Sequence, residues 1–143
     1  MKRLFIIVTL LVLLISCGGG GGGPTGPEGI PKISNLQMSP PVVPRGQAFN
    51  VSYDYLDEDN DLQGGIVRVT TDKYVIIIYP SVGIQTGTVF SFPITGAFGP
   101  SGSLGATFVI GISVPSGRYS FNIQVIDRAG HASNILSAAV DIV

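Results

Sequence analysis

Apolar and polar residues alternate with a period of two along much of the chain beyond residue 30. The segment 47–55 places Phe49, Val51, Tyr53 and Tyr55 on one face and Asn50, Ser52 and Asp54 on the other. This pattern is typical of a β-strand that buries one face, because successive side chains of a strand point to opposite sides. The same alternation predicts three more strands, with inward residues Phe108, Ile110, Ile112 and Val114; Tyr119, Phe121, Ile123 and Val125; and Leu136, Ala138, Val140 and Ile142.

Four shorter apolar segments are bounded by clusters of Gly, Pro, Asp and Asn, which favour turns. They cover residues 33–38, 66–71, 74–79 and 88–94. No stretch beyond residue 30 has the period of a helix. Seven or eight strands at this spacing predict a single all-β domain over residues 30–143, built as an antiparallel β-sandwich.

The segment 74–79 differs from the other expected strands because it is apolar on both faces. One interpretation is a strand that residues 80–105 cover on its second side. The other is a partner surface, or an edge that accepts an added strand, since a bare apolar edge would aggregate. Within the covering region we expect residues 96–105, which are rich in Gly, to form a flexible loop.

The N-terminal residues 1–16 have the composition of an export signal. Lys2 and Arg3 precede a nearly uninterrupted apolar run over residues 4–15. A helix of that length spans only about 18 Å, whereas a membrane core is roughly 30 Å thick, so a cleaved signal is favoured over a permanent span. Residues 17–29 are mostly Gly and Pro and predict a tether between this signal and the sandwich.

The end of the signal, Leu14-Ile15-Ser16-Cys17, resembles the lipobox of bacterial lipoproteins. The resemblance implies cleavage before Cys17 and attachment of diacylglycerol to its thiol, so that the membrane is a partner through an N-terminal lipid. It also implies localisation in a bacterial cell envelope, and Gly18 in place of Asp implies the outer membrane if the source is Gram-negative. The alternative is an ordinary signal peptide with an incidental Cys.

Composition excludes several classes of function. The full chain carries 8 basic and 9 acidic side chains, so it has no positive field for nucleic acid. It contains one Cys and one His, too few for a disulfide framework or for a zinc site built from these residues.

The densest charge lies in Asp57-Glu58-Asp59-Asn60-Asp61, directly after an expected strand. The carboxylates of Asp57, Asp59 and Asp61 have the alternate spacing that suits a hard cation, and Ca²⁺ is the candidate ion. An EF-hand is excluded, because Leu62 occupies the sixth position and Arg68 the twelfth. The alternative is a solvated turn whose short side chains cap backbone groups.

Two C-terminal motifs, Gly117-Arg118-Tyr119-Ser120-Phe121 and the segment 125–133, resemble a strand and turn of bacterial immunoglobulin-like, cadherin-like and fibronectin type III surface modules. The resemblance implies an immunoglobulin-like sandwich without a disulfide. It also implies a tyrosine corner, in which the Tyr119 ring is buried and its hydroxyl bonds back to nearby backbone. Similar Asp-x-Asp-x-Asp loops in these modules sometimes bind Ca²⁺.

The second motif places Asp127 at the end of a strand, on a loop that shares one end of such a sandwich with Asp57. Asp127 is therefore a further candidate ligand for the cation. The alternative role is to form the turn by accepting the amides of Gly130 and His131. His131, the single His of the chain, is expected to be an exposed loop residue.

Nothing in the sequence assembles a catalytic site, so we expect no enzymatic activity. The interpretation is a lipid-anchored cell-envelope module that displays a β-sandwich for adhesion, ligand binding or assembly, with a protein or glycan as partner. One alternative is a Ca²⁺-stabilised structural subunit of an envelope complex. The other is a small hydrolase, which at a glycosidic bond would need two carboxylates roughly 5 to 10 Å apart on different elements.

Overall fold

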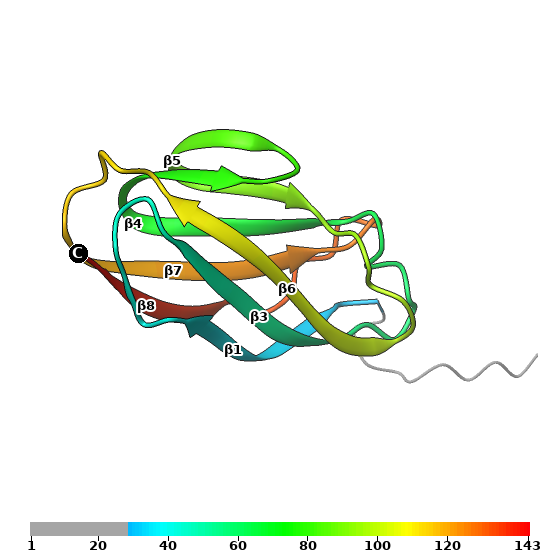
Figure 1. The fold of residues 1–143 in the computed structure, drawn as a ribbon. Coiled ribbons are helices and arrows are strands. Elements are labelled where there is room, and N and C mark those ends of the chain that lie inside the picture. Colours follow the sequence, from blue (N-terminus) through cyan, green and yellow to red (C-terminus); the bar gives the residue numbers. More distant parts are fainter. Residues whose placement is uncertain (1–28) are drawn as a thin grey trace, which may run out of the picture.

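The computed structural model describes residues 29–143, which form eight β-strands (Figure 1). The strands are β1 (Lys32–Ser39), β2 (Val42–Val43), β3 (Ala48–Leu56), β4 (Ile66–Tyr79), β5 (Gly83–Pro93), β6 (Ser101–Ile110), β7 (Gly117–Ile126) and β8 (Leu136–Ile142). The expected signal over residues 1–16, the lipidation at Cys17 and all of the tether except Gly29 lie outside the described residues. The described part contains no helix with the length and hydropathy needed to cross a membrane.

The strands form a near-closed immunoglobulin-like sandwich, which confirms the predicted fold class. Their order is β1-β3-β6-β4-β7-β8-β2, and β5 pairs with the outer edge of β4. All pairs are antiparallel except β2 and β8, which run parallel. Strand β4 joins the two layers, because its first half pairs with β7 and its end pairs with β6.

The change of layer happens at an irregular stretch in the middle of β4. The register shifts between Thr70 and Val75, where several β4 residues stand opposite Thr88 alone. Two charged side chains of this stretch fix it to β7: Asp72 accepts the Ser120 amide at 2.8 Å, and Lys73 donates to the Arg118 carbonyl at 2.7 Å. Such bulges bend a strand, which lets β4 leave one layer and enter the other.

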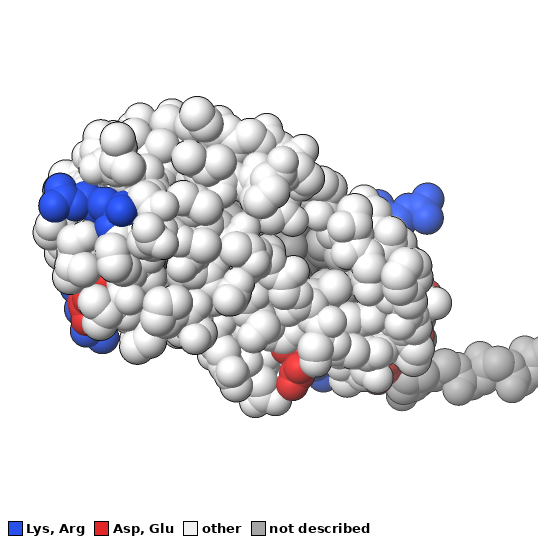
Figure 2. Space-filling model, viewed as in Figure 1, with Lys and Arg blue, Asp and Glu red and all other residues white. Residues whose placement is uncertain are grey.

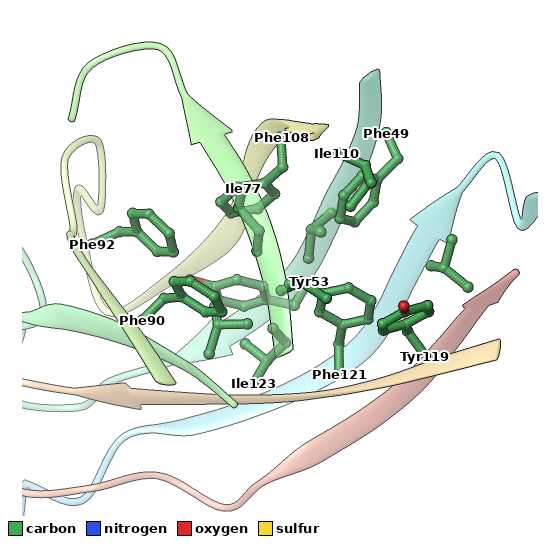
Figure 3. Packing of buried hydrophobic residues seen from close by; sticks show 14 of the residues in the cluster. Phe49, Tyr53, Ile77, Phe90, Phe92, Phe108, Ile110, Tyr119, Phe121 and Ile123 are labelled. Carbon is green, nitrogen blue, oxygen red and sulfur yellow. The ribbon is translucent and has the colours of Figure 1, made fainter. Parts of the chain in front are cut away.

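The core between the layers contains a continuous series of aromatic rings. Phe49 of β3 lies 5.6 Å from Phe121 of β7 and 5.7 Å from Phe108 of β6, measured between ring centroids. Phe108 in turn lies 5.1 Å from Phe92 of β5 and 5.3 Å from Tyr79 of β4. Figure 3 shows the four phenylalanine rings of this series between strands of both layers. The buried aliphatic and aromatic residues from Ile33 to Ile142 form one cluster, which is the hydrophobic core that a single domain needs.

The predicted tyrosine corner is confirmed, because Tyr119 is buried and its hydroxyl donates to the Pro115 carbonyl at 2.8 Å. The segment 74–79 is not a free edge, because β5 pairs with one edge and β6 and the Gly111 amide occupy the other. Its second face is only partly covered, since Val75 and Ile77 are buried on the first face whereas Tyr74 on the second is 59% exposed.

The segment 96–105 was expected to be a loop, and this is wrong for its second half. Ser101 to Gly105 belong to β6 and pair with β3. Glycine suits this strand at Gly102, where an added Cβ would stand 3.0 Å from the Tyr55 hydroxyl oxygen. The chain approaches the tyrosine closely there, and that reason is invisible in the sequence.

The strand predicted through Val114 also ends earlier, at Ile110. The Val114 amide bonds to the Gly111 carbonyl in a turn, and Ile112 is 78% exposed. Val42 and Val43, for which no strand was predicted, form the short parallel strand β2 beside the end of β8.

Candidate cation site at one pole of the sandwich

Asp57 is the first residue after β3 and is fully buried. Its amide bonds to the Pro100 carbonyl at 2.7 Å, which holds the loop against the start of β6. Its Oδ2 accepts the Leu62 amide at 2.7 Å, and Leu62 is itself buried in the core. Its Oδ1 is buried and has no hydrogen-bond partner among the described residues. Burying a carboxylate oxygen without a hydrogen-bond partner lowers the stability of the folded state, so a ligand for this atom is expected.

Asp59 and Asp61 lie beside Asp57. One carboxylate oxygen from each of the three residues falls in a group whose members are all within 4.8 Å of one another. The Oδ1 of Asp61 is also buried without a partner in the described part of the chain. Asn60 makes the tight turn between them, with φ of 59° and its amide on the Asp57 carbonyl. Asn tolerates this left-handed conformation better than most residues.

Asp127 approaches the same loop from the end of β7, as its position in the sequence predicts. The adjoining Arg128 amide bonds to the Asp61 carbonyl at 3.3 Å. The Asp127 carboxylate accepts the His131 amide at 2.8 Å and lies 3.1 Å from His131 Nδ1. The turn-forming role is thus present as expected, except that the Gly130 amide bonds to the Asp127 backbone carbonyl and not to its side chain.

The electrostatics of the cluster disfavour two of its charges. Burial, together with the neighbouring Asp59 carboxyl, raises the pKa of Asp57 to about 6. Burial also raises the pKa of Asp61, with contributions from the charges of Asp127 and Asp59. A cation among these groups would reverse both effects, because it stabilises the ionised carboxylates.

The donor set fits a hard cation. It offers carboxylate oxygens from three residues of one loop, two of these oxygens are buried without partners, and a fourth carboxylate is close by. Ca²⁺ accepts six to eight oxygen ligands, including backbone carbonyls and water, in flexible geometry. The soft ligands that would select zinc are absent from the cluster.

Sequence reasoning missed one residue of this pole, Gly29. A side-chain carbon at Gly29 would collide with the Asp59 carboxylate, and His131 Nδ1 would lie 3.2 Å from it. Its φ of 75° is a conformation that favours glycine. The end of the predicted tether therefore packs against the acidic loop. Nothing in the spacing of the motifs pointed to this contact.

Comparisons with known proteins give the fold and no family. No family model matches the sequence, and no curated protein matches it. Among solved structures, it is similar to Spo0M, the sporulation control protein of Bacillus subtilis, with a TM-score of 0.52 and 13% identity. The match covers 80% of this chain and 49% of Spo0M, so this chain spans about half the length of that protein.

Two further similar structures are small domains. One is a PKD domain of an M14-like peptidase from a Thermoplasmatales archaeon, with a TM-score of 0.43 and 14% identity over 79% of this chain and 92% of that one. The other is a CARDB domain from Pyrococcus furiosus in complex with di-metal ions, with a TM-score of 0.41 and 12% identity over 81% and 91%. At such identities the likeness concerns the fold alone.

Proposed function

We propose that this chain is a non-enzymatic, Ca²⁺-stabilised immunoglobulin-like module of a bacterial cell envelope, anchored through a lipid on Cys17. The observation that carries the cation part is the buried Asp57 carboxylate, whose Oδ1 has no partner in the described residues and lies in a group of three carboxylates. A bound cation gives that oxygen a ligand and relieves the repulsion within the loop.

The envelope part rests on the sequence. Leu14-Ile15-Ser16-Cys17 supplies the lipidation motif, and residues 17–29 supply a spacer. An anchored module needs a rigid frame with loops at its poles, and the sandwich provides both. The acidic residues named in the sequence analysis gather at one pole of the sandwich, and there they form a candidate cation site.

The cation proposal is tested on residues 29–143 by thermal unfolding and titration calorimetry with CaCl₂ after treatment with a chelator. We expect the melting temperature to rise with Ca²⁺, since a ligand that binds only the folded state stabilises it by mass action. Mg²⁺ should act more weakly, because it demands a more regular octahedral shell than this loop provides.

A matched pair of variants locates the effect. Asp59→Asn removes one ligand of the cluster, and Glu58→Gln removes the same charge from the adjacent exposed residue. We expect the first to weaken Ca²⁺ binding at least tenfold and the second to leave it nearly unchanged. Equal effects would show that the loop attracts Ca²⁺ only as a diffuse negative charge. No Ca²⁺-dependent stabilisation of the unmodified domain would refute the proposal.

A further inference from the structure

A second site, which shares no lining residue with the acidic cluster, lies between β5 and β6, at the seam where the sandwich fails to close. Strand β6 pairs with β4 only at Val109 and Ile110, and within residues 29–143 β5 has no strand partner other than β4. No backbone ladder therefore joins β5 to β6. The surface in Figure 2 is hollowed near the middle of the view.

A cavity of about 60 Å³ opens at this seam and reaches the aromatic rings of the core. Four aromatic residues line it, one from each of β3, β4, β5 and β6: Tyr53, Tyr79, Phe92 and Phe108. An open groove of about 610 Å³ adjoins it and shares its lining at Val51, Tyr79, Thr95, Gly105 and Ala106. Protein interiors rarely leave voids larger than one water molecule, which needs about 10–15 Å³, so this cavity is large for a packing defect.

The size of the cavity restricts what can enter. A cavity of about 150 Å³ is known to hold a benzene ring, so the seam is too narrow for an aromatic ring and suits the end of an alkyl chain. Replacement of poorly ordered water by an apolar group is favourable. The adjoining groove has the volume of a small-molecule site and can hold the remainder of such a ligand.

The charge around the seam restricts the ligand further. From Tyr74 to Gly117 the sequence contains no Asp, Glu, Lys, Arg or His, and none lines the cavity or the groove. Figure 2 shows no charged side chain around the hollow. A charged head group would lose hydration there without gaining a counter-charge, so a neutral head group is favoured.

Tyr53 brings a hydroxyl group to the lining of the cavity. The residue is buried, and its ring belongs to the core. Burial and the nearby Tyr79 raise the pKa of Tyr53 far above its usual range, so its proton stays available for donation. Buried tyrosine hydroxyls normally have a partner, which an oxygen of a ligand would provide.

We propose that the seam between β5 and β6 binds a neutral amphiphile with one alkyl chain, whose end enters the cavity and whose uncharged head lies in the groove with an oxygen near the Tyr53 hydroxyl. This site is separate from the acidic loop, and the proposal does not depend on Ca²⁺. Binding is therefore measured in the presence of a chelator.

The test is titration calorimetry of residues 29–143 with n-octyl β-D-glucoside below its micelle concentration. We expect binding that strengthens about fourfold per added methylene from the butyl to the octyl glucoside, until the cavity is filled. Octanoate, which has a charged head, should bind at least tenfold more weakly than the octyl glucoside. No binding of any glucoside, or equal binding of octanoate, would overturn the proposal.

Substitutions in and away from the cavity test where the ligand binds. Ala106→Leu fills the mouth shared by cavity and groove and should weaken binding at least tenfold, whereas Ala139→Leu makes the same change on remote β8 and should not. Tyr53→Phe should weaken binding about two- to tenfold, as loss of one hydrogen bond does. Equal affinities of the Ala106→Leu and Ala139→Leu variants would refute the location.

A fluorescent tryptophan at the site tests the location of binding even if the Ala106→Leu variant does not fold. The chain has no Trp, and Thr95 is exposed at the mouth, so Thr95→Trp gives one indole at the site. Its emission should shift to shorter wavelength with octyl glucoside, and that of Thr86→Trp, on the exposed face of β5, should not. A concentration-dependent dimer in the absence of ligand would show that a second copy covers the seam, and this would contradict the proposal.

Discussion

The acidic pole and the seam between β5 and β6 differ in charge and in packing, although both belong to the same sandwich. At the pole, the loop after β3 concentrates carboxylates so closely that burial and repulsion raise the pKa of Asp57 and Asp61. At the seam, residues 74–117 contain no charge and leave an apolar opening into the core. The carboxylates of the pole lack a compensating positive charge, which a hard cation would supply. The cavity at the seam lacks packing atoms, which a neutral alkyl chain would supply.

The two regions share one core, and a change to that core should disturb both. Phe49 is buried and its ring contacts Phe108, which lines the cavity, and Phe121 of the opposite layer. Phe49→Ala should lower the free energy of unfolding by about 3–5 kcal/mol, because it leaves a large void in a packed interior. Urea denaturation measures this. A loss below about 1 kcal/mol would mean that the rings do not form one cooperative unit.

The metal-free pole should make stability depend on pH. Because the pKa of Asp57 is raised to about 6, the folded state holds its proton more tightly than the unfolded state. Stability is then highest below about pH 4, where the carboxyl is protonated in both states, and falls as the pH rises through 6. The shift corresponds to a loss of about 3 kcal/mol.

Unfolding titrations of the chelator-treated domain between pH 4 and 7 check this dependence. Asp57→Asn should flatten the profile, since the amide does not titrate. Saturating Ca²⁺ should also flatten it in the unmodified domain, because the ion favours the ionised form. A profile that rises through this window would contradict the assignment of Asp57 as a buried group with a raised pKa.

The tyrosine corner sharpens the comparison because it lies at the pole remote from the acidic loop. Tyr119→Phe removes the hydrogen bond to the Pro115 carbonyl and keeps the ring. We expect a loss of about 1 kcal/mol in unfolding free energy. Affinity for Ca²⁺ and for octyl glucoside should be unchanged, which calorimetry can measure. An altered Ca²⁺ affinity would show that the two poles are coupled.

The smallest effect is expected at the exposed ion pair of Arg118 and Asp141, whose closest atoms are 3.3 Å apart. Both side chains are largely solvated, and such pairs contribute about 0–1 kcal/mol. Arg118→Gln should therefore lower the melting temperature by no more than about 4 °C. A larger loss would show that the guanidinium packs on β8 in a way that its exposure does not indicate.

Alternation of apolar and polar residues predicted most of the fold, because each strand buries one face. The alternation failed to predict the structure where a residue's place depends on its neighbours in the fold. Gly102 looks like a loop residue, yet it lies in β6 because Tyr55 needs the space. Ile112 continues an apolar pattern, yet it is exposed because the chain turns after Ile110.

The acidic cluster was predictable from local spacing, since Asp57, Asp59 and Asp61 belong to one short loop. The approach of Asp127 followed from the fold class. The contact of Gly29 with Asp59 and the cavity at the seam were not predictable, because both depend on how distant segments pack. The absence of charge from residues 74–117 was the sequence signal that could have indicated the seam.

The contact between Gly29 and Asp59 places the N-terminal end of the domain at the acidic pole, whereas Val143 bonds to Val43 and Arg45 at the opposite end (Figure 1). A pull between these two points runs along the strands and loads their hydrogen bonds together in shear. Survival under such tension is set by the rate of unfolding and not by equilibrium stability. Force applied between residues 29 and 143 would thus act on the strand pairs of the sandwich along their length.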